Sequence, residues 1–163
     1  MEIQEAISGR RSIRKYTKED VADDDIGKIL EAGRWAPSGL NNQPWMFMVL
    51  RGNEKDSIAK YTKYCNIING APVCIAVFLD GKAGYDRTKD VLSIGACIQN
   101  MLLAIHGIRL GSVWLGEILK RRVVVERELN VRHELMAVIA IGHPAERRSS
   151  ERKEIGELMV WSG

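Results

Sequence analysis

Four residues near the N-terminus could together bind a phosphate monoester. Arg10, Arg11, Ser12 and Arg14 follow the end of a short predicted helix. Guanidinium groups form bidentate, charge-assisted hydrogen bonds with phosphate oxygens, and a serine hydroxyl can add a further bond. The same segment could instead be an exposed basic loop that pairs with residues 19–25, five of which are Asp or Glu. The local pattern leaves both interpretations open.

A loop rich in amide side chains lies further along the chain. Residues 36–45 read APSGLNNQPW and are dense in Pro, Gly and Asn. Asn and Gln side chains each offer a donor and an acceptor, which suits the edge of a heteroaromatic ring that carries both kinds of group. Alternatively, Asn41 and Asn42 could bond their own backbone in a turn.

Two further segments could contact a ligand. Residues 111–117, GSVWLGE, form an apolar run that ends in a glycine turn, where Gly116 would let backbone N–H groups approach a ligand closely. An ordinary strand end would show the same pattern. The basic residues near the C-terminus could supply a second phosphate contact or form a solvated tail; they are Arg147, Arg148, Arg152 and Lys153.

Several classes of site are excluded by what the sequence lacks. The three histidines lie in unrelated contexts and form no metal-binding pattern, and His106 is expected to be a packed or capping residue of a helix. The three cysteines are odd in number and have no CxxC spacing, so a disulfide framework is not expected. The sequence contains no GxSxG, Walker A or Rossmann glycine motif, which argues against hydrolase, P-loop and classical dinucleotide-binding interpretations.

The apolar periodicity predicts helices and strands that alternate along the chain. A helix ends at Gly9, and a second, capped by Asp23 or Asp24, stops before Pro37. The strongest helix runs from about Arg87 to Ile105 and is apolar nearly all round, which indicates burial on several sides. Such alternation favours a sheet covered by helices on both faces. The remaining predictions are strands at 45–50, 73–79, 110–115 and 135–141, and helices at 54–64 and 118–129.

Length and composition indicate one compact domain, residues 1–163, with 45% hydrophobic and 28% charged residues. These fractions and the net charge of +3 are not those of a disordered chain. No apolar run approaches the roughly 18 residues of a membrane-spanning helix. Because the N-terminus begins MEIQE, with acids where a signal peptide carries cations, we expect a cytoplasmic protein with no membrane partner.

Taken together and in this order, these segments resemble the FMN-dependent nitroreductase family. The similarity spans nearly the whole chain, because four motifs occur in the family's order. They are RRSIRKY at 10–16, APSG with NNQPW within 36–45, the long apolar helix that leads into LGSVWLG at 110–116, and AIGHPAE at 140–146. The resemblance implies an α+β fold, a three-layer αβα sandwich with a mainly antiparallel central sheet.

The resemblance also implies an activity and a set of ligand contacts. It implies an FMN-dependent oxidoreductase that passes electrons from NAD(P)H to a small organic acceptor, such as a nitroaromatic or a quinone, by a ping-pong mechanism. It further implies a homodimer with FMN at the subunit interface. By position, Arg10, Ser12, Arg14 and Arg152 resemble phosphate or ribityl ligands, and Arg11 and Asn41 resemble contacts of the flavin ring edge or ribityl chain. The other implied cofactor contacts are Pro37, Ser38, Gly39, Gln43, Leu115, Gly116 and Glu117.

Two other functions remain open from the residues alone. A flavin-binding protein without catalysis would show the same motifs. A small nucleic-acid-binding domain could use residues 10–18, where five of nine side chains are basic, but it would lack interleaved aromatics and a known binding-fold signature. The chain is short for the family, and residues 80–90 leave little room for a helix that covers a substrate cleft.

Overall fold

A four-stranded antiparallel sheet forms the centre of the computed structural model, which describes residues 2–160. The strands lie in the order β1-β2-β4-β3, so β1 and β3 form the two edges. All residues of β2 are buried, which explains its uninterrupted apolar sequence. The strands are β1 (Trp45–Leu50), β2 (Val73–Leu79), β3 (Gly111–Leu115) and β4 (Glu134–Gly142).

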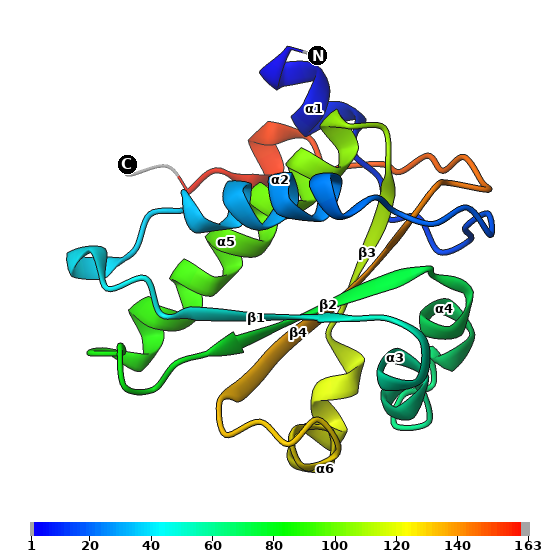
Figure 1. Ribbon diagram of the computed structural model, residues 1–163. Helices are drawn as coiled ribbons and strands as arrows, with labels where there is room; N and C mark the ends of the chain where they lie inside the picture. The colour runs from blue at the N-terminus through cyan, green and yellow to red at the C-terminus, as the bar shows by residue number, and fades with distance from the viewer. Residues whose placement is uncertain (1, 161–163) are drawn as a thin grey trace.

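Helices cover both faces of this sheet (Figure 1). One face packs against α2 and α5, and the other faces α3, α4 and α6. The predicted three-layer αβα sandwich with an antiparallel sheet is therefore confirmed. The helices are α1 (Ile3–Gly9), α2 (Asp23–Arg34), α3 (Gly52–Ala59), α4 (Cys65–Gly70), α5 (Arg87–Gly107) and α6 (Arg122–Glu128), with 3₁₀ turns η1 (Gly39–Asn41), η2 (Glu117–Arg121) and η3 (Ile155–Leu158).

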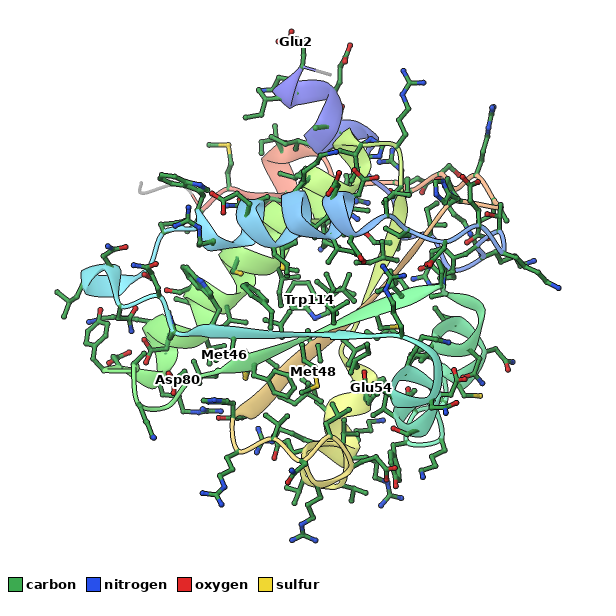
Figure 2. The ribbon with its side chains drawn as sticks, viewed as in Figure 1. Glu2, Met46, Met48, Glu54, Asp80 and Trp114 are labelled. Carbon is green, nitrogen blue, oxygen red and sulfur yellow. The ribbon has the colours of Figure 1, made fainter. Side chains whose placement is uncertain are left out.

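Strand alternation divides the core into two apolar layers. On β2, Val73 and Ile75 pack toward α2 and α5, whereas Cys74 and Phe78 pack toward α3 and α6. The same alternation holds for the edge strand β1, where Met46 and Met48 lie on the side of α3 and α6 (Figure 2). Strand β2, which the sequence predicts to be buried, is therefore buried on both faces of the sheet.

Helix α5 is the long apolar helix that the sequence predicts. It packs closely on α2, since a Cβ atom at Gly33 would lie 2.8 Å from the Met101 Cγ atom. Leu92 lies on its outer side and is 69% exposed. By length and composition alone α5 could cross a bilayer, but core helices of soluble proteins pass the same test, and this helix packs against the sheet and α2.

Three predicted elements differ in detail. The helix expected at 54–64 ends at Ala59, where the Tyr61 and Thr62 amides donate to carbonyls three residues back, and the separate α4 was missed. The helix expected at 118–129 begins as the 3₁₀ turn η2 before α6. The N-cap of α2 is Ala22, so Asp23 and Asp24 lie in the first turn instead, where negative charge favours the helix dipole.

The segment after α1 extends the sheet beyond β3. Ser12 forms a parallel bridge with Ser112, and the Ile13 amide donates to the Ser112 carbonyl at 2.9 Å. A Cβ atom at Gly111 would lie 2.9 Å from Ile13 side-chain atoms, so glycine permits this close approach. The arginine-rich segment is thereby held along the free edge of β3.

Candidate functional site

The basic segment and the C-terminal tail together form a small cavity at the edge of β3. The cavity measures about 270 Å³ and is lined by five arginines and three serines. No carboxylate belongs to its lining among residues 2–160. We call it the arginine cavity; its lining is Arg10, Arg11, Ser12, Arg14, Arg148, Ser149, Ser150 and Arg152.

Local backbone contacts place the first arginines. The Arg10 amide donates to the Ala6 carbonyl and closes α1. The Arg11 Nη1 atom donates to the Ser8 carbonyl at 2.6 Å and to the Arg10 carbonyl at 2.9 Å. The bridge of Ser12 to β3 then fixes the chain beside the sheet. The cations are thus positioned by rigid elements on both sides.

Positive charge in the arginine cavity is not fully compensated. Burial, followed by repulsion from Arg152 and Arg11, lowers the pKa of the Arg10 guanidinium. The Arg11 Nε atom is buried and has no hydrogen-bond partner in the described part of the chain, residues 2–160. Buried donors and like charges without partners are costly. An anion with several acceptor oxygens would relieve both costs.

The alternative partner for the basic segment, residues 19–25, is engaged elsewhere. Arg51 contacts Asp20 at 2.5 Å and Asp23 at 3.2 Å. Within the described part of the chain, no salt bridge joins residues 10–18 to residues 19–25. The structure therefore does not show the exposed basic loop paired with this acidic stretch.

Glu146 compensates part of the cavity's charge from the side. Its carboxylate accepts from the Arg14 amide at 2.7 Å and from the Arg148 Nε atom at 2.9 Å. These two hydrogen bonds lower the pKa of the Glu146 carboxyl. Since it is the backbone of Arg14 that is held, its guanidinium stays on the cavity, where it contacts the Ser12 carbonyl at 3.3 Å.

The structure distinguishes among the C-terminal cations. Arg152 lines the arginine cavity, and within residues 2–160 its side chain bonds only to the Ser150 hydroxyl at 2.8 Å and the Glu151 carbonyl at 2.7 Å. Lys153 does not line it, and Arg148 is already paired with a carboxylate. Arg152 is therefore the tail cation best placed for a phosphate.

A second cavity of about 370 Å³ adjoins the first and shares Arg10, Arg11 and Arg148 with it. His106, in the last turn of α5, lies on its wall. Burial and then the neighbouring Arg10 and Arg11 lower the pKa of this imidazole. His106 is packed, as predicted, close to Gly9, whose Cβ atom would lie 3.1 Å from the Nε2 atom.

The amide-rich loop has an unusual backbone. Leu40, Asn41 and Gln43 have φ values of 54°, 55° and 48°, in the left-handed region that side chains rarely adopt. The Ser38 hydroxyl accepts from the Gln43 amide at 3.0 Å. Asn42 anchors the loop, because its Nδ2 atom donates to the Asp90 carboxylate at 2.7 Å. Strained backbone of this kind is concentrated at ligand sites.

One chain does not bring this loop to the arginine cavity. The loop precedes Trp45, which pairs with Leu79 beside Glu134, at one end of the sheet. Ser12 bridges Ser112 on the opposite edge strand, at the other end of the sheet. The two sets of predicted contacts therefore lie at diagonal corners of the sheet. The loop set is Pro37, Ser38, Gly39, Asn41 and Gln43.

The predicted contacts Leu115, Gly116 and Glu117 lie at the end of β3 that is farther from Ser112. The Leu115 side chain is buried in the core, and Gly116 has open space where a Cβ atom would lie. Its φ of −95° does not require glycine, so the open space is what distinguishes the position. Glu117 accepts from the Thr62 hydroxyl at 2.6 Å, which lowers the pKa of the Glu117 carboxyl.

Two groups of site residues were missed by the sequence interpretation. Ser149 and Ser150 line the arginine cavity but follow two arginines in a stretch that reads as a solvated tail. A larger cavity of about 580 Å³ lies beside Glu117 and is lined by cations from Lys60, Lys63, Lys120 and Arg121. The two halves of this cavity are distant in sequence, so no local pattern indicated it.

Comparison with known proteins agrees with the resemblance. The family model described as the nitroreductase family matches residues 7–65 and 53–143. A protein of Methanothermobacter thermautotrophicus with the provisional name NADH dehydrogenase/NAD(P)H nitroreductase is 36% identical over 151 residues, 90% of this chain and 79% of its own. The FMN reductase [NAD(P)H] of Bacillus subtilis is 24% identical, over 92% of this chain and 69% of its own.

A provisionally named nitroreductase of Desulfovibrio desulfuricans, solved in complex with FMN, superposes with a TM-score of 0.97. It is 46% identical and covers 100% of this chain and 98% of its own. The NADPH:FMN oxidoreductase of Vibrio harveyi complexed with NAD⁺ shares the fold, with a TM-score of 0.91 at 20% identity, over 98% of this chain and 76% of its own. Fold, family model and sequence relatives agree: the chain belongs to the nitroreductase family.

Proposed function

We propose that this protein is a homodimeric, FMN-dependent NAD(P)H oxidoreductase that reduces a small organic acceptor such as a nitroaromatic or a quinone. The single observation that carries the proposal is the arginine cavity, where cations gather without a lining carboxylate in the described chain. The proposal extends to residues 1–163 as one FMN-binding domain located in the cytoplasm. Neither a nucleic acid nor a membrane is part of it.

The residues of the arginine cavity fit the phosphate of FMN. The partnerless Arg11 Nε atom and the mutual repulsion of Arg10 and Arg152 are both relieved by a dianionic ligand. Ser12 adds a hydroxyl at the sheet edge. The relatives support this choice, because the structure from Desulfovibrio desulfuricans that superposes on the whole chain is a complex with FMN.

In this reaction the chain itself would bind and orient FMN and leave space for the electron donor and the acceptor. When bound, FMN supplies the redox chemistry, taking electrons from NAD(P)H and passing them to the acceptor. Arg10, Ser12, Arg14 and Arg152 would hold its phosphate beside the Ser112 end of β3. The open side of Gly116, at the other end of β3, leaves room for the ring and for donor and acceptor in turn. Such ping-pong alternation requires no general acid or base from the chain.

The separation of the two predicted contact sets supports a dimer with the site at its interface. The loop 37–43 and the arginine cavity occupy diagonal corners of one sheet. A two-fold partner would bring the loop of one subunit to the flavin site along β3 of the other. There Asn41 and Gln43 would offer amides to the ring edge, and Ser38 and Gly39 would offer their backbone. The outer side of α5, which carries the exposed Leu92, is the proposed contact surface.

Cofactor and turnover are tested on the purified protein. Flavin is released by denaturation and identified by chromatography, and NAD(P)H oxidation is followed with and without an added quinone. We expect FMN and acceptor-dependent oxidation. FMN binding without any oxidation would identify a flavin-binding protein without catalysis, and FAD in place of FMN would contradict the proposed phosphate site.

A further inference from the structure

The largest cavity described above lies on the opposite layer of the sandwich from α5. It measures about 580 Å³ and is open between the connection of α3 to α4 and the segment that follows β3. We call it the lysine cavity. Its lining is Lys60, Tyr61, Thr62, Lys63, Glu117, Lys120, Arg121 and Val124.

A polar contact between distant segments fixes the floor of the lysine cavity. The Glu117 carboxylate accepts from the buried Thr62 hydroxyl at 2.6 Å and from the Lys63 amide at 3.3 Å, across 55 and 54 positions of sequence. These bonds hold the two walls at a defined distance. The single lining carboxylate is thereby occupied by hydroxyl and amide donors.

The cations of this cavity are poorly neutralised. Lys120 lies 3.7 Å from Glu117, a long contact to a carboxylate that already has two donors. Lys60 lies 3.5 Å from Glu128. Within residues 2–160, Lys63 and Arg121 form no salt bridge, and Lys63 lies over the Tyr64 ring. Four cations thus face two carboxylates, Glu128 outside the lining and Glu117 with two donors already bound. The result is a concave surface with net positive charge, which concentrates anions.

The position of the lysine cavity relates it to the proposed flavin site. Its wall begins at Glu117, directly after β3 and the open side of Gly116. Ser112, near the other end of β3, bridges Ser12 of the arginine cavity. At about 3.3 Å per residue, the five positions from Ser112 to Glu117 span roughly 17 Å of chain. A ligand placed at Gly116 could therefore reach the lysine cavity without using the cations proposed for FMN.

We propose that the lysine cavity binds the phosphate groups of the nicotinamide dinucleotide that donates electrons to this enzyme. The inference rests on the proposed function, since it assigns a binding subsite to the electron donor of that reaction. Lysine ammonium groups bind phosphate as point charges, and Arg121 adds a guanidinium fork. The pyrophosphate and the 2′-phosphate of such a donor share this chemistry, and the experiment distinguishes them.

The test uses variants whose side chains form no ion pair in the described structure. Lys63→Ala, Arg121→Ala and the double variant are prepared as FMN-loaded protein. Binding of ADP-ribose, which has only the pyrophosphate, and of 2′-phospho-ADP-ribose is measured by calorimetry. We expect each single substitution to weaken binding roughly tenfold or more, the scale of a hydrogen bond to a charged group. Arg127→Ala, an exposed cation of α6 outside the cavity, is the matched control.

Steady-state kinetics provide a second readout. The ratio of kcat/KM for NADPH to kcat/KM for 1-benzyl-1,4-dihydronicotinamide, a donor without phosphate, should fall at least tenfold in the double variant. Weaker binding of both ADP-ribose and 2′-phospho-ADP-ribose would assign the cavity to the pyrophosphate. A loss confined to the 2′-phosphorylated ligand assigns it to the 2′-phosphate and predicts a preference for NADPH.

Two results would overturn the proposal while leaving the proposed function intact. One is unchanged binding of both ligands and an unchanged kinetic ratio in the double variant. The other is an equal effect of Arg127→Ala, which would reflect net charge only. Failure of the proposed function is a separate outcome, recognised when the wild-type protein binds no FMN or oxidises neither NADPH nor the benzyl donor.

Discussion

Replacing Arg152 by alanine should weaken FMN binding while leaving the apoprotein at least as stable. Arg152 lines the arginine cavity, and among the residues that the structure describes its side chain bonds only to Ser150 and Glu151 beside it. Its charge also repels Arg10 and contributes to the lowered pKa of that guanidinium. The side chain therefore has no stabilising partner far away in the sequence, and a bound phosphate would be its main one.

The magnitude follows from these contacts. Loss of one hydrogen bond to a charged group costs about 1.5–3 kcal/mol, which is roughly a tenfold to hundredfold rise in Kd. In the apoprotein, removal of a repelling cation should change the free energy of unfolding by only about 0–1 kcal/mol, in the stabilising direction. Arg152→Lys should restore binding in part, because an ammonium cannot reproduce the guanidinium fork.

Fluorescence quenching on titration of apoprotein with FMN measures the affinity, and urea unfolding measures the stability. Lys153→Ala is the matched control, since Lys153 adjoins Arg152 but does not line the cavity. Unchanged FMN affinity in Arg152→Ala, or an equal loss in Lys153→Ala, would refute the assignment of the arginine cavity as the phosphate site. A large loss of apoprotein stability would refute the account of Arg152 as an unpaired cation.

Four further outcomes are expected. Asp90→Asn should lower the free energy of unfolding in urea by about 1.5–3 kcal/mol, because the buried carboxylate accepts from Asn42 at 2.7 Å and from two backbone amides; a loss below about 0.5 kcal/mol would contradict this. Burial raises the pKa of the Cys74 thiol to about 12. A thiol reagent at pH 8 should therefore label the partly exposed Cys65 and spare the buried Cys74. Labelling of Cys74 would contradict its burial. Because the thiol of Cys74 holds its proton more tightly in the folded than in the unfolded protein, the free energy of unfolding should fall as pH rises from about 9 toward 12. Urea unfolding should show a smaller fall over this pH range in Cys74→Ala. Leu92→Asp should convert the dimer to a monomer in light scattering, and a retained dimer mass would remove this side of α5 from the interface.

The main elements could be predicted because their patterns are local. The apolar run of β2 and the nearly all-round apolar α5 show their burial directly in the sequence. The break between α3 and α4 could not be predicted in this way. No glycine or proline lies between Ala59 and Cys65, and the Thr62 hydroxyl in this segment bonds to Glu117, which is 55 positions away in the sequence.

Part of the candidate site could likewise be predicted from local sequence, and part depends on how distant segments pack together. The arginines at 10–14 form a compact sequence motif in a predicted loop, and the structure holds them together at one edge of the sheet. The choice of Arg152 over Lys153 depends on the path of the tail, which no periodicity specifies. The lysine cavity was missed because Lys60 and Arg121 each lie in a charged stretch that is typical of a solvated helix face. Only the packing of these two stretches against one sheet makes a concave surface.

The visible absorption spectrum of the purified protein, followed by chromatography of the released cofactor, tests the central claim most directly. The account predicts a flavin spectrum and a released compound that co-elutes with FMN, either as purified or after reconstitution. A protein that shows no flavin absorption after incubation with FMN, or that releases FAD, would contradict the proposal that the arginine cavity binds the FMN phosphate.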